Sequence, residues 1–154
     1  MEQQIIEALK LVIAKYGESL AIQVEQIFRT ETTHFKSRGF TITLSPGMEA
    51  FTKKQPYGWV VAEQFWKDNK QYAPVGIHNQ VENTSALAKS RGVRSFIKFP
   101  SIEAAFMTVA FIIYARGGDG GAWFSINDKV FRKKYNDFLE TIRPRFVIKI
   151  QSIN

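Results

Sequence analysis

The sequence contains no cysteine, only two histidines and no apolar run long enough to cross a bilayer. Without cysteine, disulfides, thiolate catalysis and cysteine-ligated zinc are all excluded. His34 and His78 lie far apart and show no HExxH spacing, so we expect no metal site and no cofactor. No stretch reaches the roughly 18 apolar residues of a transmembrane helix, so no membrane span is predicted.

Further patterns are absent. Residues 1–16 mix acidic with apolar side chains, so no signal peptide is expected there. The glycine-rich run 117–121 follows a predicted helix instead of preceding one, which excludes a phosphate-binding loop and indicates a helix stop and a flexible loop. With no internal repeat and no low-complexity linker, residues 1–154 are predicted to form one domain.

Charge is distributed unevenly over the 154 residues, which carry a net charge of +7. Residues 1–50 hold five Lys and Arg against six Asp and Glu, whereas residues 51–154 hold sixteen against eight. This excess of positive charge in residues 51–154 favours an anionic partner such as nucleic acid, an anionic membrane surface or an acidic cell-wall polymer. Solubility alone is an equally simple explanation.

Hydrophobic periodicity predicts four helices. Residues 3–15 and 20–32 have apolar side chains at helical spacing, and Ser19 is expected to cap the second of these helices. Residues 102–116, capped by Ser101, are apolar nearly all round, as is typical of a helix at the centre of a domain. A last helix follows Asn127 and Asp128 and ends at Pro144. Its inward face is expected to hold Val130, Phe131, Tyr135, Phe138, Leu139 and Ile142.

The middle of the chain is less regular. Residues 37–47 are predicted to form a loop and residues 55–59 a turn, with a short helix over 60–66. Residues 75–99 fit either an irregular loop or a small hairpin. The predicted fold is therefore mainly α, with α+β possible, and consists of a central apolar helix and an irregular middle lobe.

Glu31 is the strongest candidate for chemistry. It lies where the helix over 20–32 ends, and Ile27 and Phe28, four and three residues earlier, place it on the apolar stripe. Burial and the negative end of the helix dipole both disfavour its ionised form. A carboxyl that keeps its proton near neutral pH is what a glycosidase needs as general acid. The alternative is an ordinary acid at a helix end.

Several motifs, in order along the chain, resemble those of glucosaminidase-type peptidoglycan hydrolases of the lysozyme superfamily. The acid motif is Glu31-Thr32-Thr33-His34-Phe35-Lys36-Ser37, and Pro56-Tyr57-Gly58-Trp59 is similar to the family's aromatic-glycine motif. Residues 96–105 resemble the start of its late helix, and Tyr135 lies where the family often keeps a tyrosine. The resemblance spans about residues 20–142. It implies a lysozyme-like domain that cleaves a β-1,4 bond in peptidoglycan glycan, with Glu31 as the acid.

A second catalytic carboxylate has several candidates. Glu82 in the middle lobe and Glu49 after the turn at residues 45–47 are the leading ones, and Glu63 is another. Each is also compatible with a solvated surface acid, and the acetamido group of an N-acetyl sugar can replace the protein nucleophile. Contacts with substrate are expected from Tyr57, Trp59, His34 and Tyr135, although aromatic core packing and a loop histidine are the simpler alternatives.

Two rival functions remain at this level. A non-catalytic lysozyme-like module could bind the cell wall or form part of a phage tail, because a fold does not establish an activity. A basic nucleic-acid-binding protein is compatible with Arg91, Arg94 and Lys98 interleaved with Phe96 and Phe99, but no nucleic-acid-binding motif is present. The expected partner is peptidoglycan or a related polysaccharide, at a cell wall reached by another export route or through a phage.

Overall fold

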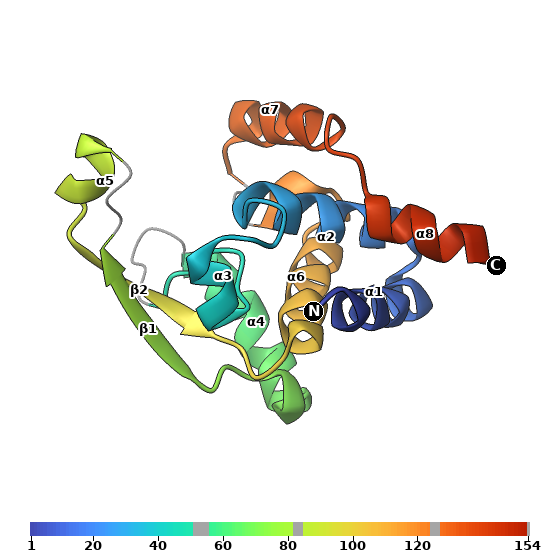
Figure 1. Ribbon diagram of the computed structural model, residues 1–154, viewed down its shortest axis with the longest axis horizontal. Helices are drawn as coiled ribbons and strands as arrows, with labels where there is room; N and C mark the ends of the chain where they lie inside the picture. Colours follow the sequence, from blue (N-terminus) through green and yellow to red (C-terminus); the bar gives the residue numbers. More distant parts are fainter. Residues whose placement is uncertain (51–55, 82–84, 124–126, 154) are drawn as a thin grey trace.

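The protein is mainly helical, as the sequence predicts. The computed structural model describes residues 1–50, 56–81, 85–123 and 127–153, with the backbone alone for residues 56–59. The long helices gather on one side of the molecule, and a two-stranded sheet projects on the other (Figure 1). Within the described ranges, no helix has both the length and the apolar character that a membrane crossing requires.

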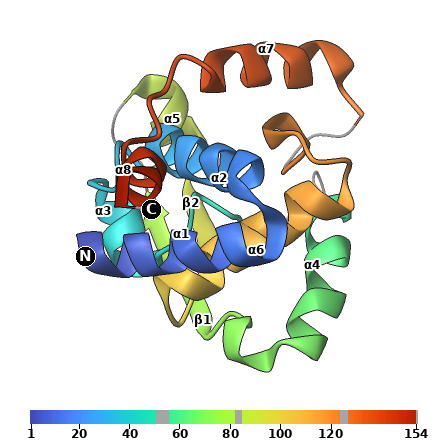
Figure 2. The ribbon, with the colours of Figure 1, turned by 90° about the vertical axis from the view of Figure 1, so that its right-hand side faces the viewer.

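Helix α6 (Ile102–Ala115) is the centre of the core. Its N-cap forms as predicted, because the Ser101 hydroxyl accepts a hydrogen bond from the amide of Ala104 at 3.0 Å. Helices α1 (Glu2–Tyr16) and α2 (Glu18–Glu31) pack against it, and Figure 2 shows α1 and α6 side by side. Most of α6 is buried, which explains its almost uniformly apolar sequence. The cap predicted at Ser19 is wrong, because α2 already begins at Glu18 with Gly17 as its N-cap.

The middle lobe contains an antiparallel hairpin, the more ordered of the two alternatives. Strands β1 (Gly76–Val81) and β2 (Val93–Lys98) pair with Gly76 opposite Lys98 and Val81 opposite Val93. Between them lies the short helix α5 (Ala86–Ser90). On the other edge of β2, Glu49 forms a single β-bridge with Phe96. The segment around Glu49 thereby joins the sheet.

Two predictions in the middle of the chain are wrong. The loop expected over 37–47 contains helix α3 (Arg38–Thr43), whose N-cap Ser37 accepts a hydrogen bond from the Phe40 amide at 3.2 Å. The turn expected over 55–59 is the first turn of α4 (Pro56–Asp68), because proline suits the first position of a helix. Gln55 lies outside the described residues. A single turn of 3₁₀ helix, η1 (Lys70–Tyr72), follows.

The C-terminal helices also differ from the prediction. Helix α7 (Lys129–Leu139) is capped by Asp128, but Val130, Phe131 and Phe138 are 67%, 40% and 49% exposed instead of facing inward. This helix lies on the outside, where one side alone contacts α2 and the 3₁₀ turn η2 (Gly120–Trp123). Helix α8 (Arg145–Ile153), which was not predicted, begins directly after Pro144.

Candidate functional site

Glu31 is the last residue of α2 and follows the fully buried Ile27 and Phe28. The next residue, Thr32, closes the helix with its buried side chain. Its hydroxyl donates to the carbonyl of Phe28 and accepts from the amide of Phe35 at 2.9 Å. The end of α2 is therefore fixed by a side chain, and the Glu31 carboxyl is held at that end.

An unusual turn follows α2. Thr33, His34 and Phe35 have positive φ angles of 51°, 53° and 68°, a conformation that costs an L-residue with a Cβ atom about 1–2 kcal/mol. A backbone hydrogen bond from His34 to the carbonyl of Arg29, 2.8 Å long, and the burial of Phe35 offset this cost. The Phe35 ring packs, at centroid distances of 5.6–6.3 Å, against Phe28, Phe40, Phe106 and Phe146. This turn prevents α2 from continuing past Glu31.

The Glu31 carboxyl lies against Tyr135, 104 residues away in sequence. The Tyr135 hydroxyl donates a hydrogen bond to Glu31 Oε1 at 2.9 Å. Solvent reaches Glu31, but the surrounding protein removes enough water to raise the pKa of the carboxyl. The Tyr135 hydrogen bond lowers this pKa by a smaller amount. Glu31 therefore keeps its proton to a higher pH than an ordinary glutamate does.

Tyr135 is suited to remain a hydrogen-bond donor. Burial, followed by the nearby charge of Glu31, raises the pKa of its phenol. The indole of Trp123, in η2, interacts with the same side chain and opposes the shift. The phenol stays protonated throughout the range in which Glu31 titrates, so it can donate to either form of the carboxyl.

Arg29, the cation nearest to Glu31 in sequence, is engaged elsewhere. Its Nε donates to Glu25 Oε2 at 2.6 Å, and both side chains are buried. The guanidinium also lies over the ring of Phe146, 4.6 Å from its centroid. Within the described residues Lys36 forms no ion pair with Glu31 either. A neighbouring positive charge would lower the pKa of Glu31, and neither of these supplies one.

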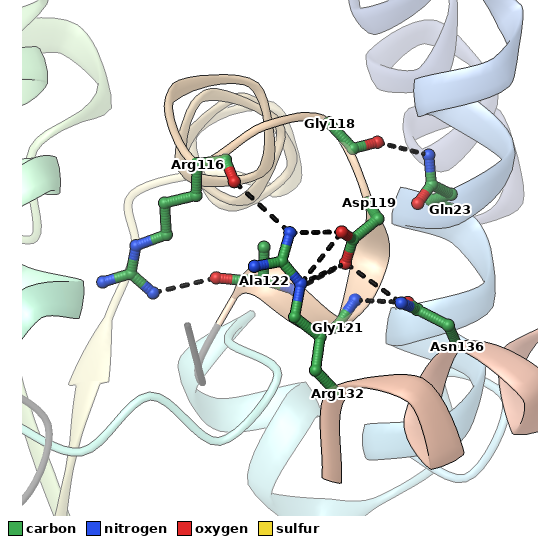
Figure 3. Close-up of polar contacts among 8 residues, drawn as sticks. All are labelled: Gln23, Arg116, Gly118, Asp119, Gly121, Ala122, Arg132 and Asn136. Carbon is green, nitrogen blue, oxygen red and sulfur yellow. Dashed lines mark hydrogen bonds and ion pairs between the residues drawn. The ribbon is translucent and has the colours of Figure 1, made fainter. Parts of the chain in front are cut away.

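A polar cluster fixes α7, and with it Tyr135. In Figure 3 the Arg132 side chain reaches Asp119, with Nε 2.9 Å from both carboxylate oxygens. Asn136 accepts from the amide of Gly121 at 2.6 Å and donates to Asp119 at 3.1 Å. Arg132 lowers the pKa of Asp119 by its hydrogen bonds. These contacts set the register of α7 against the loop that follows α6.

Glycine is required at the point of closest approach. A Cβ atom on Gly121 would lie 2.8 Å from the carbonyl oxygen of Arg132, which is part of α7. A Cβ atom on Gly120 would lie 2.6 Å from a methyl group of Leu139. Gly120 and Gly121 are buried in η2, so the flexible loop predicted for the glycine run is wrong at its second half. Its first half does end α6 as predicted, with Gly117 and Gly118 at positive φ.

Glu31 lines a cavity of about 160 Å³ that is also bordered by the hairpin. The other lining residues come from α3, from the turn that follows it and from both strands: Ser37, Gly39, Phe40, Thr43, Ser45, Gly47, Gln80 and Phe96. A substrate group entering this cavity would meet the carboxyl on one side and the sheet on the other. Nothing in the sequence marked Gln80 or Phe96 for this place, because the pairing of the strands decides it.

Glu49 lies on the same face of the sheet as these two residues. Phe96 is opposite both Glu49 and His78, and Gln80 is opposite Arg94, so side chains at all these positions share one face. The Glu49 carboxylate forms an ion pair with Arg94 and is about one-third exposed. The structure therefore brings Glu49 to the sheet face that borders the cavity, with a cationic partner.

Of the other predicted site residues, His34 has a described side chain, and it does not line this cavity. His34 lines a separate pocket with Arg29, Lys36 and Arg145. Tyr57 and Trp59 belong to the first turn of α4, but their side chains are outside the described structure, and Glu82 lies outside the described residues. Among the residues that are described, no group of three or more His, Cys, Asp or Glu could hold a metal ion.

Comparisons with protein-family models, with curated proteins and with solved structures found no match to this chain.

Proposed function

We propose that the protein is a glycoside hydrolase that cleaves β-1,4 bonds in peptidoglycan glycan strands, in the manner of an endo-N-acetylglucosaminidase. The observation that carries the proposal is the Glu31 carboxyl: it ends a helix, lines a cavity, has a raised pKa and accepts a hydrogen bond from Tyr135. The ordered motifs from Glu31 to Tyr135 support the same reading.

In this mechanism Glu31 acts as general acid. Its proton passes to the leaving glycosidic oxygen as the C–O bond breaks and positive charge develops on the sugar ring. The Tyr135 hydroxyl, 2.9 Å from Glu31 Oε1, holds the carboxylate that forms, because a hydrogen bond to a charged acceptor is stronger than one to a neutral acid. General acid catalysis of this kind contributes roughly 10²–10⁴-fold to a rate.

The second group in the reaction is Glu49, Glu82 or the acetamido group of the substrate. Glu49 is the candidate with structural support, since it shares the cavity-facing side of the sheet and Arg94 holds its carboxylate. If Glu49 is the base, Glu49→Gln removes activity as Glu31→Gln does. If the substrate's own acetamido group replaces the protein carboxylate, the Glu49→Gln variant keeps most of the wild-type hydrolysis rate.

The nucleic-acid alternative is weaker in light of the hairpin. Phe96 and Phe99 are only 5% and 3% exposed, so their faces are not available for stacking on bases. Arg94, which the basic pattern of this segment includes, is engaged by Glu49.

Digestion of purified peptidoglycan tests the proposal. Wild type, Glu31→Gln and the control Glu7→Gln are compared by mass spectrometry of the released ends. Glu7 is an exposed acid on α1, and its carboxylate accepts hydrogen bonds from Gln3 and Lys10 of the same helix. We expect new reducing N-acetylglucosamine ends from wild type and the control, and none from Glu31→Gln.

The other outcomes are informative. Reducing N-acetylmuramic acid ends would leave the role of Glu31 as general acid in place, but would show that the enzyme cleaves the bond that a muramidase cleaves. Equal activity in Glu31→Gln would overturn the role of Glu31. No product from folded wild type on several peptidoglycans would favour the non-catalytic wall-binding or phage-tail module.

A further inference from the structure

One flank of α7 presents aromatic rings to solvent beside the Glu31 site. Phe131 and Phe138 are 40% and 49% exposed. They are seven residues apart, which places them on the same side of the helix, two turns and about 10.5 Å from each other. That separation is about the length of two pyranose rings in an extended chain.

This flank is continuous with the candidate acid. The Phe131 ring stacks on that of Tyr135, with centroids 6.0 Å apart and an interplanar angle of 20°. Tyr135 in turn donates to Glu31. A sugar ring bound in contact with Phe131 would therefore extend the same chain of contacts that reaches the carboxyl.

The flank is kept outward by the adjacent side of the helix, which faces the protein. Arg132, Asn136 and Leu139 bind or pack against the loop of residues 118–123. Because these residues are anchored, α7 cannot rotate to bury Phe131 and Phe138. The contacts between α7 and residues 118–123 therefore hold these two rings at the surface.

Positive charge accompanies the rings. In α7, Arg132 and Lys133 pair with Asp119 and Asp137. Lys134 lies between Phe131 and Phe138 in sequence and is exposed, and no carboxylate of the described residues forms an ion pair with it. Aromatic faces pack on the apolar faces of sugar rings, and an ammonium group attracts carboxylates. The combination suits a glycan that carries acidic groups.

We propose that Phe131, Phe138 and Lys134 form a binding platform for the substrate strand, an acid-bearing β-1,4-linked glycan, on the α7 side of the Glu31 site. The proposal rests on the proposed function for the identity of the ligand. The two rings bind sugar faces along the strand, and Lys134 binds a carboxylate of its lactyl or peptide substituents.

Binding without turnover tests the platform. Co-sedimentation with insoluble peptidoglycan is measured in a Glu31→Gln background, with Phe131→Ala, Phe138→Ala and Lys134→Gln added one at a time. The matched control is Val130→Ala, an exposed residue of α7 turned by about 100° from Phe131. We expect Phe131→Ala to weaken binding about tenfold and Phe138→Ala several-fold, as for exposed anchor residues in a binding surface, while Val130→Ala leaves it unchanged.

Two further measurements separate stacking from charge and from misfolding. Phe131→Trp keeps an aromatic face, so it should restore the binding that Phe131→Ala loses. Lys134→Gln should weaken binding to peptidoglycan at low salt and leave binding to neutral N-acetylglucosamine oligomers unchanged. Equal binding by Phe131→Ala and Val130→Ala would overturn the platform.

Failure of the platform and failure of the proposed function give different results. If wild type hydrolyses peptidoglycan and the α7 variants bind like the control, the platform is wrong and the hydrolase stands. If wild type binds through Phe131 and hydrolyses nothing, the platform stands on a non-catalytic module.

Discussion

Two glutamates on α2, six residues apart, have opposite surroundings. Glu25 is fully buried and accepts hydrogen bonds from Arg29 at 2.6 Å and from the amides of Phe146 and Val147 at 3.0 and 2.7 Å. Glu31 is reached by solvent and accepts from the neutral hydroxyl of Tyr135. The first carboxylate is balanced by a cation and two amides, whereas the second is partly dehydrated beside a neutral donor.

The hydrogen-bonding partners of these carboxyls, more than their burial, separate a structural acid from a candidate catalytic one. Glu25 ties α2 to the start of α8, and its charge is compensated. At Glu31 the loss of water outweighs the Tyr135 hydrogen bond, so its pKa is raised. Substitutions of these two glutamates should therefore act on different properties.

Substitution of Glu25 should change stability more than any other substitution considered. Glu25→Gln leaves the buried guanidinium of Arg29 without its counter-charge, which should lower the free energy of unfolding by about 3–5 kcal/mol. Urea unfolding of wild type and variant measures it. A loss under about 1 kcal/mol would show that Glu25 is not a structural acid, and the contrast with Glu31 would fail.

Tyr135→Phe should have an intermediate effect, on activity. The Tyr135 hydroxyl lowers the pKa of Glu31, so its removal should raise this pKa and shift the alkaline limb of the pH–rate profile to higher pH. The rate at the optimum should fall about tenfold, because the carboxylate formed in the transition state loses a donor. Tyr114→Phe, which alters an exposed tyrosine on α6, serves as control. An unchanged pH profile would mean that the hydrogen bond does not tune the acid.

The smallest effect is a gain in stability from Glu31→Gln. Because the pKa of Glu31 is raised on folding, its charge opposes folding, and stability falls as pH rises from the ordinary value through the raised one. Above that pH window, the free energy of unfolding of Glu31→Gln should exceed that of wild type by no more than about 1 kcal/mol, since solvent screens the carboxyl. Below about pH 4 both side chains are neutral and the difference should vanish.

Thermal unfolding of Glu31→Gln and Glu7→Gln across pH measures this gain. A Glu31→Gln variant that is destabilised at neutral pH as strongly as Glu25→Gln would erase the distinction between the two acids.

The sequence predicts those features that depend on local periodicity. The helices α1, α2 and α6, the Ser101 cap and the place of Glu31 at the end of an apolar stripe are all present. The six residues of α3 are too few for a periodic signal, and Ser37 was their one local marker. The outward rings of α7 were predicted to be core, because a hydrophobic stripe does not reveal whether another element covers it.

The site itself depends on contacts between distant segments. The hydrogen bond between Glu31 and Tyr135 needs the register of α7, which Asp119, Asn136 and the close approach at Gly121 determine. The diversion of Arg29 to Glu25 also depends on where α8 begins. The contact between Glu31 and Tyr135 has no signature in residue spacing. The pair of Glu25 and Arg29 has the i,i+4 spacing of a helical ion pair, but that spacing does not reveal that the pair is buried beside α8.

The left-handed turn at Thr33–Phe35 has a consequence for how the site is assembled. Such a turn, made without glycine, persists only while the Phe35 ring is seated in its aromatic cluster. An early, loosely packed form of the chain would let α2 run on past Glu31 and carry the carboxyl away from Tyr135. The contact between Glu31 and Tyr135 therefore depends on the packing of Phe35 into the core, although neither residue of that contact touches this ring by a hydrogen bond.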